Sequence, residues 1–228
     1  MIVAAHQPMY MPWLGFFHKW LKSDLFVFLD DVEYISRDFF NRNMIKTDQG
    51  GAWLSVPISH QSNERPYINE VKINNGHNWF KKHWGSLRFY YGKAQYFDRY
   101  REFFEQIYNK EWDDLLSLNV TLLKFFSNEL KVNVDTTYSS SMNITEKATR
   151  RLINICKKVG ADTYLSGIGA KAYLETELFD QEGIRLVFQE FQHPVYPQLF
   201  GDFIPNMSVT DLLLNCGPED SSNIIKGC

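Results

Sequence analysis

A histidine and a glutamine stand side by side near the start of AHQPMYMPWLGFF, residues 5–17, directly after a short apolar run. His6 can act as a general base, or it can donate a hydrogen bond to a phosphate or a developing oxyanion. The alternative is a histidine that only pins a turn. Because Gln7, also polar, follows at the same strand end, we expect His6 to be catalytic and Gln7 to bind substrate.

The same segment contains two prolines, which fix φ and would hold Tyr10 and Trp13 rigidly over a ligand. Trp13 can stack on a base or a sugar ring, or it can cover the core. Gly15 opens an apolar helical stretch, where the missing side chain allows close backbone approach and a helix N-terminus favours anions. We expect all three residues to contact substrate.

Two adjacent carboxylates, Asp30 and Asp31, end the apolar run DLFVFL at residues 24–29. Neighbours on a strand point to opposite faces, so one of them is expected to face a crevice. That carboxylate can hold Mg²⁺ or accept a proton. The alternative is a turn followed by a helix cap.

A basic segment follows, with three cations within ten residues and amide side chains between them. Arginine forks suit phosphate or carboxylate groups, although a solvated basic loop would have the same composition. The candidate substrate-binding residues of this segment are Arg37, Asn41, Arg42, Asn43 and Lys46.

The stretch YLSGIGA, residues 164–170, is typical of a strand followed by a glycine turn. Such a turn can present backbone N–H groups to an anion, which makes Ser166, Gly167 and Gly169 candidate ligand contacts. Position 172 is Ala, so the full Gly-x-Gly-x-x-Gly pattern is absent and we do not expect a nicotinamide enzyme.

A last polar cluster, HPVYPQ at residues 193–198, forms a rigid loop after a predicted strand. His193 can be a second acid–base group or a brace for this loop. Tyr196 and Gln198 are candidate substrate contacts.

Continuous apolar runs and helical spacings predict the elements that must position these residues. The sequence indicates an α/β fold, with a mostly parallel sheet flanked by helices in a nucleotidyltransferase or Rossmann-like layout. Ligands bind beyond the carboxyl ends of such strands, where His6, the two aspartates and Ser166 would meet. The expected strands cover residues 2–6, 24–29, 132–137, 161–166 and 184–191, and a helix over 13–22 completes a right-handed βαβ unit.

A helical middle segment is expected over about residues 77–130, with breaks at Gly92 and at 109–110. Shorter strands are predicted at 53–58 and 67–73. Asn143, with a glutamate three residues later, predicts a capped helix, and a similar pattern at Ser208 starts a closing helix. We expect one α/β domain over 1–217 with the helical insertion, and a frayed tail over 218–228.

Composition bounds the class of protein. The chain has 228 residues and a net charge of −3, so no basic field exists to gather nucleic acid. Its three cysteines form neither a disulfide framework nor a zinc motif. The sequence shows no signal peptide and no membrane-length apolar run, so we expect a cytoplasmic protein without a membrane span. The oligomeric state is open.

The chain resembles the WbqC-like family. The blocks that carry the resemblance span almost the whole chain in family order: HQPMYMPWLGFFHKW, SDLFVFLDDVEY, NRNMIK, YLSGIGAKAYL, HPVYPQ and FIPNMSVTDLLLNCG. Members are found in bacterial gene clusters for O-antigen and related polysaccharides of lipopolysaccharide. The resemblance therefore implies a role on a nucleotide sugar, but it supplies no reaction.

The layout of the first strand and helix is also similar to nucleotidyltransferase-like folds such as pantothenate synthetase, although the His-x-Gly-His pair of those enzymes is absent here. By analogy, we expect an ATP-dependent ligase that activates a small carboxylate such as glycine and joins it to a nucleotide-linked amino sugar. ATP and Mg²⁺ would be the cofactors. The alternatives are an ATP-independent acyl- or glycosyltransferase, and a sugar-nucleotide binding protein without catalytic activity.

Overall fold

The computed structural model describes the chain except for residues 37 and 60–64, and its centre is a parallel sheet. The strands lie in the order β7-β2-β1-β8-β9, and every neighbouring pair is parallel. This confirms the predicted α/β fold. The strands are β1 (Ile2–His6), β2 (Leu25–Phe28), β7 (Asp135–Tyr138), β8 (Thr163–Ser166) and β9 (Arg185–Phe188).

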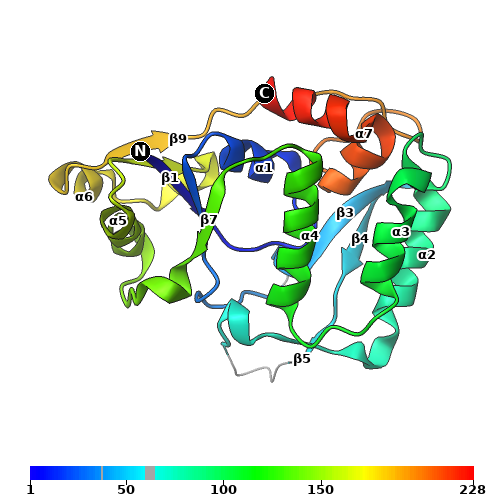
Figure 1. Cartoon of the computed structure of the whole chain (residues 1–228), viewed down its shortest axis with the longest axis horizontal. Helices are drawn as coiled ribbons and strands as arrows, with labels where there is room; N and C mark the ends of the chain where they lie inside the picture. Colours follow the sequence, from blue (N-terminus) through cyan, green and yellow to red (C-terminus); the bar gives the residue numbers. More distant parts are fainter. Residues whose placement is uncertain (37, 60–64) are drawn as a thin grey trace.

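Helices cover both faces of this sheet, which is why its central strands are apolar along their length (Figure 1). Alternate residues of β2 enter different cores: Phe26 and Phe28 join one cluster, and Val27 joins the other. The first cluster contains residues of α1 (Leu14–Leu21), α4 (Leu115–Glu129) and α7 (Val209–Lys226). The second contains residues of α5 (Ala148–Val159) and α6 (Thr176–Gln181).

The strand order has a consequence for ligand binding. From β1 the chain moves outward to β2 and β7, and then returns to the other side of β1 to form β8 and β9. The connections therefore diverge between β1 and β8. A crevice at such a topological switch point, outside the carboxyl ends of the strands, is the usual ligand site of an open α/β sheet.

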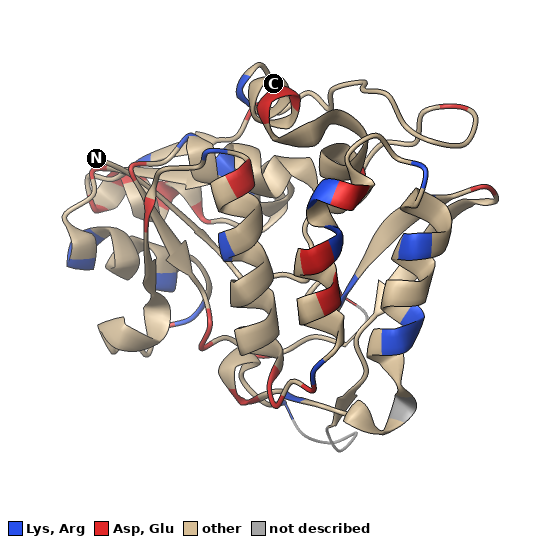
Figure 2. Cartoon of the chain, turned by 45° about the vertical axis from the view of Figure 1, so that its right-hand side comes forward, with Lys and Arg blue, Asp and Glu red and all other residues tan. Residues whose placement is uncertain are grey.

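The helical middle segment is present, with helices α2 (Trp79–Tyr91), α3 (Phe97–Tyr108) and α4, and the chain breaks where the sequence predicted. Acidic and basic residues are interspersed on α3, whereas the charged residues of α2 are all basic (Figure 2). Within the described ranges, no helix is long and apolar enough to cross a bilayer. Short 3₁₀ helices occur at η1 (Ile68–Glu70), η2 (Asn75–His77), η3 (Ser139–Met142) and η4 (Ile168–Ala172).

From Arg42 onward the basic segment is a strand and not a solvated loop. Residues from Arg42 onward form β3 (Arg42–Thr47), which pairs antiparallel with β4 (Gly50–Ser55) in a separate hairpin. A second small sheet joins β5 (Ile58–Ser59) to β6 (Lys72–Ile73). The strand predicted at 53–58 is divided between β4 and β5, and the strand predicted at 67–73 is shortened to β6. The strand β3 was not predicted because polar residues that usually face solvent, among them Asn43 and Lys46, are buried in the fold.

Two helix boundaries also differ from expectation. Asn143 does not cap α5; it adopts a left-handed conformation (φ 54°) after η3, and α5 begins at Ala148. The predicted frayed tail is instead the second half of α7, which bends at Gly217 and continues to Lys226. Ser222 is buried there and its hydroxyl donates to the Leu130 carbonyl at 2.8 Å.

Candidate active site

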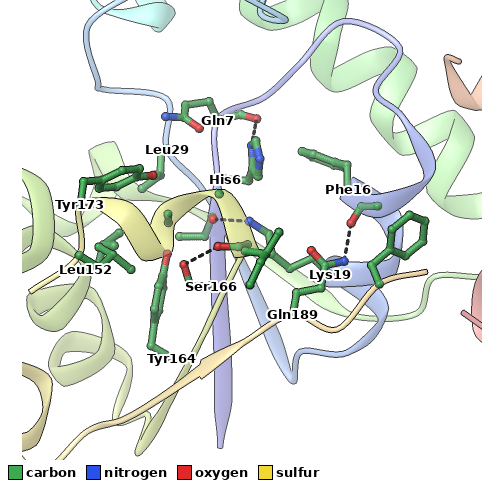
Figure 3. Close-up of a pocket in the computed structure, with 18 of the residues that line it drawn as sticks. His6, Gln7, Phe16, Lys19, Leu29, Leu152, Tyr164, Ser166, Tyr173 and Gln189 are labelled. Carbon is green, nitrogen blue, oxygen red and sulfur yellow. Dashed lines mark hydrogen bonds between the residues drawn. The ribbon is translucent and has the colours of Figure 1, made fainter. Parts of the chain in front are cut away.

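A cavity of about 830 Å³ lies at the switch point between β1 and β8. Its walls come from the carboxyl ends of β1, β8 and β9, from one face of α1, and from the start of α5 (Figure 3). The volume is typical of small-molecule sites in proteins. The polar side chains in its lining include His6, Gln7, Lys19, Arg151, Tyr164, Ser166, Tyr173, Gln189, Glu190 and Gln192.

Lys19 is a buried lysine in the lining of this cavity. Its side chain is 4% exposed, and Nζ donates a hydrogen bond to the Ala5 carbonyl oxygen at 3.0 Å. Burial penalises the ammonium form and lowers the pKa of Lys19 to about 7. At neutral pH the lysine is therefore present both as a cation and as a free amine.

The helix α1 positions this lysine. Gly15 and Phe16 precede Lys19 by four and three residues, so both share with Lys19 the face of α1 that lines the cavity. Ala5 lies next to His6 at the end of β1, and the hydrogen bond from Nζ joins the helix to this strand. The βα turn thus places an amine beside the strand end.

His6 lines the same cavity. Its Nδ1 lies 3.1 Å from the carbonyl oxygen of Gln7, and its ring packs edge-on against Phe16 at 5.0 Å. Burial, and then the charge of Lys19, lower the pKa of His6 far below its usual value. The imidazole is therefore neutral near pH 7. Because a carbonyl only accepts, Nδ1 carries the hydrogen and Nε2 keeps a lone pair.

Trp13 and Gly15 form a fitted pair in the cavity wall. A Cβ atom on Gly15 would lie 2.4 Å from the indole ring of Trp13, so only glycine admits the ring at this place. The indole also meets Phe191 edge-on at 5.2 Å. Gln189 connects the segment after β9 to this turn, because its Nε2 donates a hydrogen bond to the Gly15 carbonyl at 2.8 Å. An aromatic surface is thereby fixed at the cavity.

An ion pair braces the opposite wall. Arg151 is buried, and its guanidinium contacts the carboxylate of Asp31. The hydroxyl of Ser139 donates to the same carboxylate oxygen. Arg151 lines the cavity, whereas Asp31 lies behind it. The carboxylate therefore fixes a cation at the edge of the site.

The structure brings fewer than half of the residues that the sequence nominated into the cavity lining. Those in the cavity lining are His6, Gln7, Trp13, Gly15, Ser166, Gly167 and Gly169. They come from β1, from the βα turn and from the turn after β8, as the strand-end rule predicts. A Cβ atom on Gly167 or Gly169 would meet nothing within 4 Å, so the space there is open.

Two nominated residues lie in the interior instead of the cavity. Tyr10 is fully buried, and its hydroxyl bonds Tyr108 at 2.6 Å and His83 at 2.9 Å. Asp30 is buried and accepts hydrogen bonds from the Ser140 amide at 3.0 Å and from its hydroxyl at 2.7 Å. These contacts fix distant segments of the chain, so neither side chain is placed over a ligand.

The amides and cations of the basic segment also lie elsewhere, and Arg37 is outside the described residues. Asn41 donates to the Val56 carbonyl at 2.7 Å, and Asn43 donates to the Met11 carbonyl at 2.8 Å. The guanidinium of Arg42 stacks on Trp53, with 4.3 Å to the ring centroid. Lys46 is buried and donates to the Asp202 carbonyl.

The cluster at 193–198 braces its own loop. The Asn206 amide donates to His193 Nε2 at 3.0 Å, so Nδ1 carries the hydrogen that bonds the Pro194 carbonyl at 2.9 Å. Tyr196 and Gln198 donate to the buried carboxylate of Asp211 at 2.9 and 2.7 Å. Both nitrogens of His193 are thus engaged by backbone groups, and His193 is not part of the cavity lining.

Sequence reasoning missed Lys19, Arg151 and Gln189 as cavity residues. Lys19 has a weak signal, because it falls on the same helical face as Gly15 in a segment that was already nominated. Arg151 and Gln189 have none, since their partners lie more than one hundred residues away. Within the described part of the chain, no group of three histidine, cysteine, aspartate or glutamate residues could hold a metal ion.

The fold and the cavity define an open parallel α/β protein with a cavity of small-molecule size at its switch point. The chain belongs to the WbqC-like protein family, whose model matches residues 7–223. The uncharacterized protein Rv1507c of Mycobacterium tuberculosis is 36% identical over 219 residues, which cover 95% of this chain and 94% of the relative. No solved structure matches the chain.

Proposed function

We propose that this protein is an acyl-transfer enzyme that forms an amide on a nucleotide-linked amino sugar, in the synthesis of O-antigen or surface-polysaccharide precursors in the cytoplasm. The observation that carries the proposal is the buried amine of Lys19 at the switch-point cavity. A group that can hold or release a proton near pH 7 suits general acid–base catalysis.

The reaction needs a base, because an amine loses a proton when it becomes an amide. The sugar nitrogen attacks the acyl carbon, the new C–N bond forms, and the bond to the leaving group breaks. The neutral amine of Lys19 accepts the proton that the sugar nitrogen loses. His6, neutral and with a free lone pair on Nε2, accepts a hydrogen bond that orients the incoming amine.

The cavity walls fit the rest of such a substrate. Trp13 and Phe191 offer aromatic surface for a base or a sugar ring. Gln7, Gln189 and Ser166 offer donors and acceptors for sugar hydroxyl groups. The guanidinium of Arg151 offers positive charge to the diphosphate.

The acyl donor separates two versions of the proposal. An activated donor, such as a thioester, needs no further cofactor. A free carboxylate such as glycine needs ATP and Mg²⁺ to become an acyl-adenylate first. By the nucleotidyltransferase analogy, the phosphates would fall to Arg42 and Lys46, and the magnesium ion to Asp30 or Asp31. All four residues lie outside the cavity lining. This placement favours an activated donor.

A thermal-shift panel tests the proposal. Ligands are UDP-, GDP- and dTDP-linked amino sugars, ATP with Mg²⁺, and Mg²⁺ alone. A ligand that binds only the folded state raises the Tm by mass action. We expect a shift with an amino-sugar nucleotide, followed by amide formation when a thioester donor is added. A shift with ATP and Mg²⁺ beyond Mg²⁺ alone would favour the ATP-dependent version, and no shift with any sugar nucleotide would contradict the proposal.

A further inference from the structure

We propose that the amine of Lys19 is also a nucleophile, which condenses with the carbonyl group of an aldehyde or ketone ligand in the cavity to form an imine. The proposal goes beyond acyl transfer, in which the same nitrogen only accepts a proton. It assigns to this cavity a class of ligand that carries a carbonyl carbon at its reactive end.

The first support is the placement of the nitrogen. Lys19 is buried and lines the cavity, and within the described residues its Nζ has one hydrogen bond, to the Ala5 carbonyl. That bond anchors the amine to the end of β1 and engages one N–H. The lone pair of the neutral amine is then free to meet a carbonyl carbon, which is the geometry that an imine-forming lysine needs.

The second support is the electrostatic surrounding. Among the ion pairs of the described residues, none involves Lys19. The charged groups of neighbouring elements that line the cavity are Arg151 of α5 and Glu190 after β9, and Asp31 is held by Arg151. His6 is the neighbouring titratable group on β1, and Tyr164 lies on β8. An amine without a close carboxylate has little to hold it in the protonated form.

Burial has a kinetic consequence for this amine. With a pKa of about 7, Lys19 is unprotonated in roughly half of the molecules near pH 7. An ordinary exposed lysine is unprotonated in only about one molecule in two thousand at that pH. The neutral form is the nucleophile. The unprotonated fraction of Lys19 near pH 7 is therefore roughly a thousandfold larger than that of an exposed lysine.

The chemical step balances without a cofactor. The Nζ lone pair attacks the carbonyl carbon and a C–N bond forms. Two protons pass from nitrogen to oxygen, the C–O bond breaks, and one water molecule leaves. The C=N bond that remains is hydrolysed by the reverse path, and no electrons are gained or lost.

The test is reductive trapping with a small aldehyde. The wild-type protein is treated near neutral pH with glyoxylate and sodium cyanoborohydride, which reduces the imine to a stable secondary amine. Peptide mass spectrometry then locates the modified lysine at low conversion. We expect Lys19 to be modified about tenfold or more faster than any exposed lysine. The Lys19→Arg variant should lose this fast phase, and Lys22→Arg, an exposed residue at the end of the same helix, should keep it.

Uniform labelling of the surface lysines, with no preference for Lys19, would overturn the inference. The result is distinguishable from failure of the proposed function. A protein that binds an amino-sugar nucleotide but does not trap glyoxylate at Lys19 refutes the imine alone. A protein that traps glyoxylate at Lys19 but binds no sugar nucleotide refutes the proposed substrate alone.

Discussion

The Nζ atom of Lys19 lies 3.0 Å from the carbonyl oxygen of Ala5, and this bond places an amine inside the cavity at the switch point of the sheet. Burying an ammonium group costs free energy that one carbonyl cannot offset. A residue that lowers stability in this way is typical of functional sites, where activity is retained at the expense of the folded state.

Replacement of Lys19 by methionine should stabilise the protein near pH 7. The folded pKa is about 7, below the unfolded value of about 10.4, so the unfolded chain binds more protons between these values. The wild-type free energy of unfolding should therefore rise with pH across this range, and the penalty is fully present below about pH 7. Removing it should add about 3–5 kcal/mol near pH 7.

Urea unfolding at neutral and alkaline pH measures this effect. Lys22→Met, at an exposed position next to the same helix, is the matched control and should leave the free energy of unfolding almost unchanged. If Lys19→Met unfolded at a lower urea concentration than the wild type, the lysine would be a structural residue.

Turnover should depend on pH through the same group. The neutral amine accepts the proton, so kcat/KM for acyl transfer should rise about tenfold per pH unit below pH 7 and level off above it. His6 stays neutral over this range, because its pKa is far below its usual value. A bound diphosphate would favour the ammonium form and should displace the kcat profile to higher pH. A flat profile for both constants would exclude Lys19 as the base.

Gly15→Ala should damage the cavity wall although alanine favours helices. The new Cβ would stand 2.4 Å from the Trp13 ring, so the indole must move. We expect a loss of stability of about 1–3 kcal/mol from overpacking, against a gain of about 1 kcal/mol in helix propensity. Gly85→Ala in α2, where a Cβ meets nothing within 4 Å, provides the control and should stabilise the protein. Calorimetry of both variants measures the Tm. If the two substitutions shifted the Tm in the same direction, the close contact between Gly15 and Trp13 would not be important for stability.

Asp31→Ala should leave the Arg151 guanidinium buried without its carboxylate. We expect a loss of about 2–3 kcal/mol, because an uncompensated buried charge is costly. Glu33→Ala removes the carboxylate of an exposed pair with Lys147 and should cost much less. Denaturant titration of both variants decides the matter, and equal losses would show that the Asp31 pair has no special role.

The sheet and the strand-end residues could be predicted because their signals are local. The apolar run at 24–29 marks a strand that is buried on both faces, and His6 and Ser166 sit where such strands end. Asp30 and Lys46 misled the prediction because their partners are far away in sequence. Ser140 accounts for Asp30, and the Asp202 carbonyl accounts for Lys46.

Lys19 could not be singled out for a related reason. A lysine on a short helix is usually a solvated charge, and only the approach of β1 to α1 turns this one into a buried amine. The same holds for His193, whose two nitrogens are engaged by backbone groups of a folded loop. Tertiary contacts, and not residue type, decided which polar groups became available to a ligand.

The most direct measurement is calorimetric titration of an amino-sugar nucleotide into the wild type and two glycine variants. Gly167→Phe adds a ring at the cavity wall, where the backbone is extended (φ −67°, ψ 148°) and a Cβ meets nothing within 4 Å. Gly85→Phe adds the same ring on α2, away from the cavity. We expect Gly85→Phe to bind like the wild type and Gly167→Phe to bind about tenfold or more weakly. Unchanged affinity in a folded Gly167→Phe protein would show that the ligand does not enter this cavity.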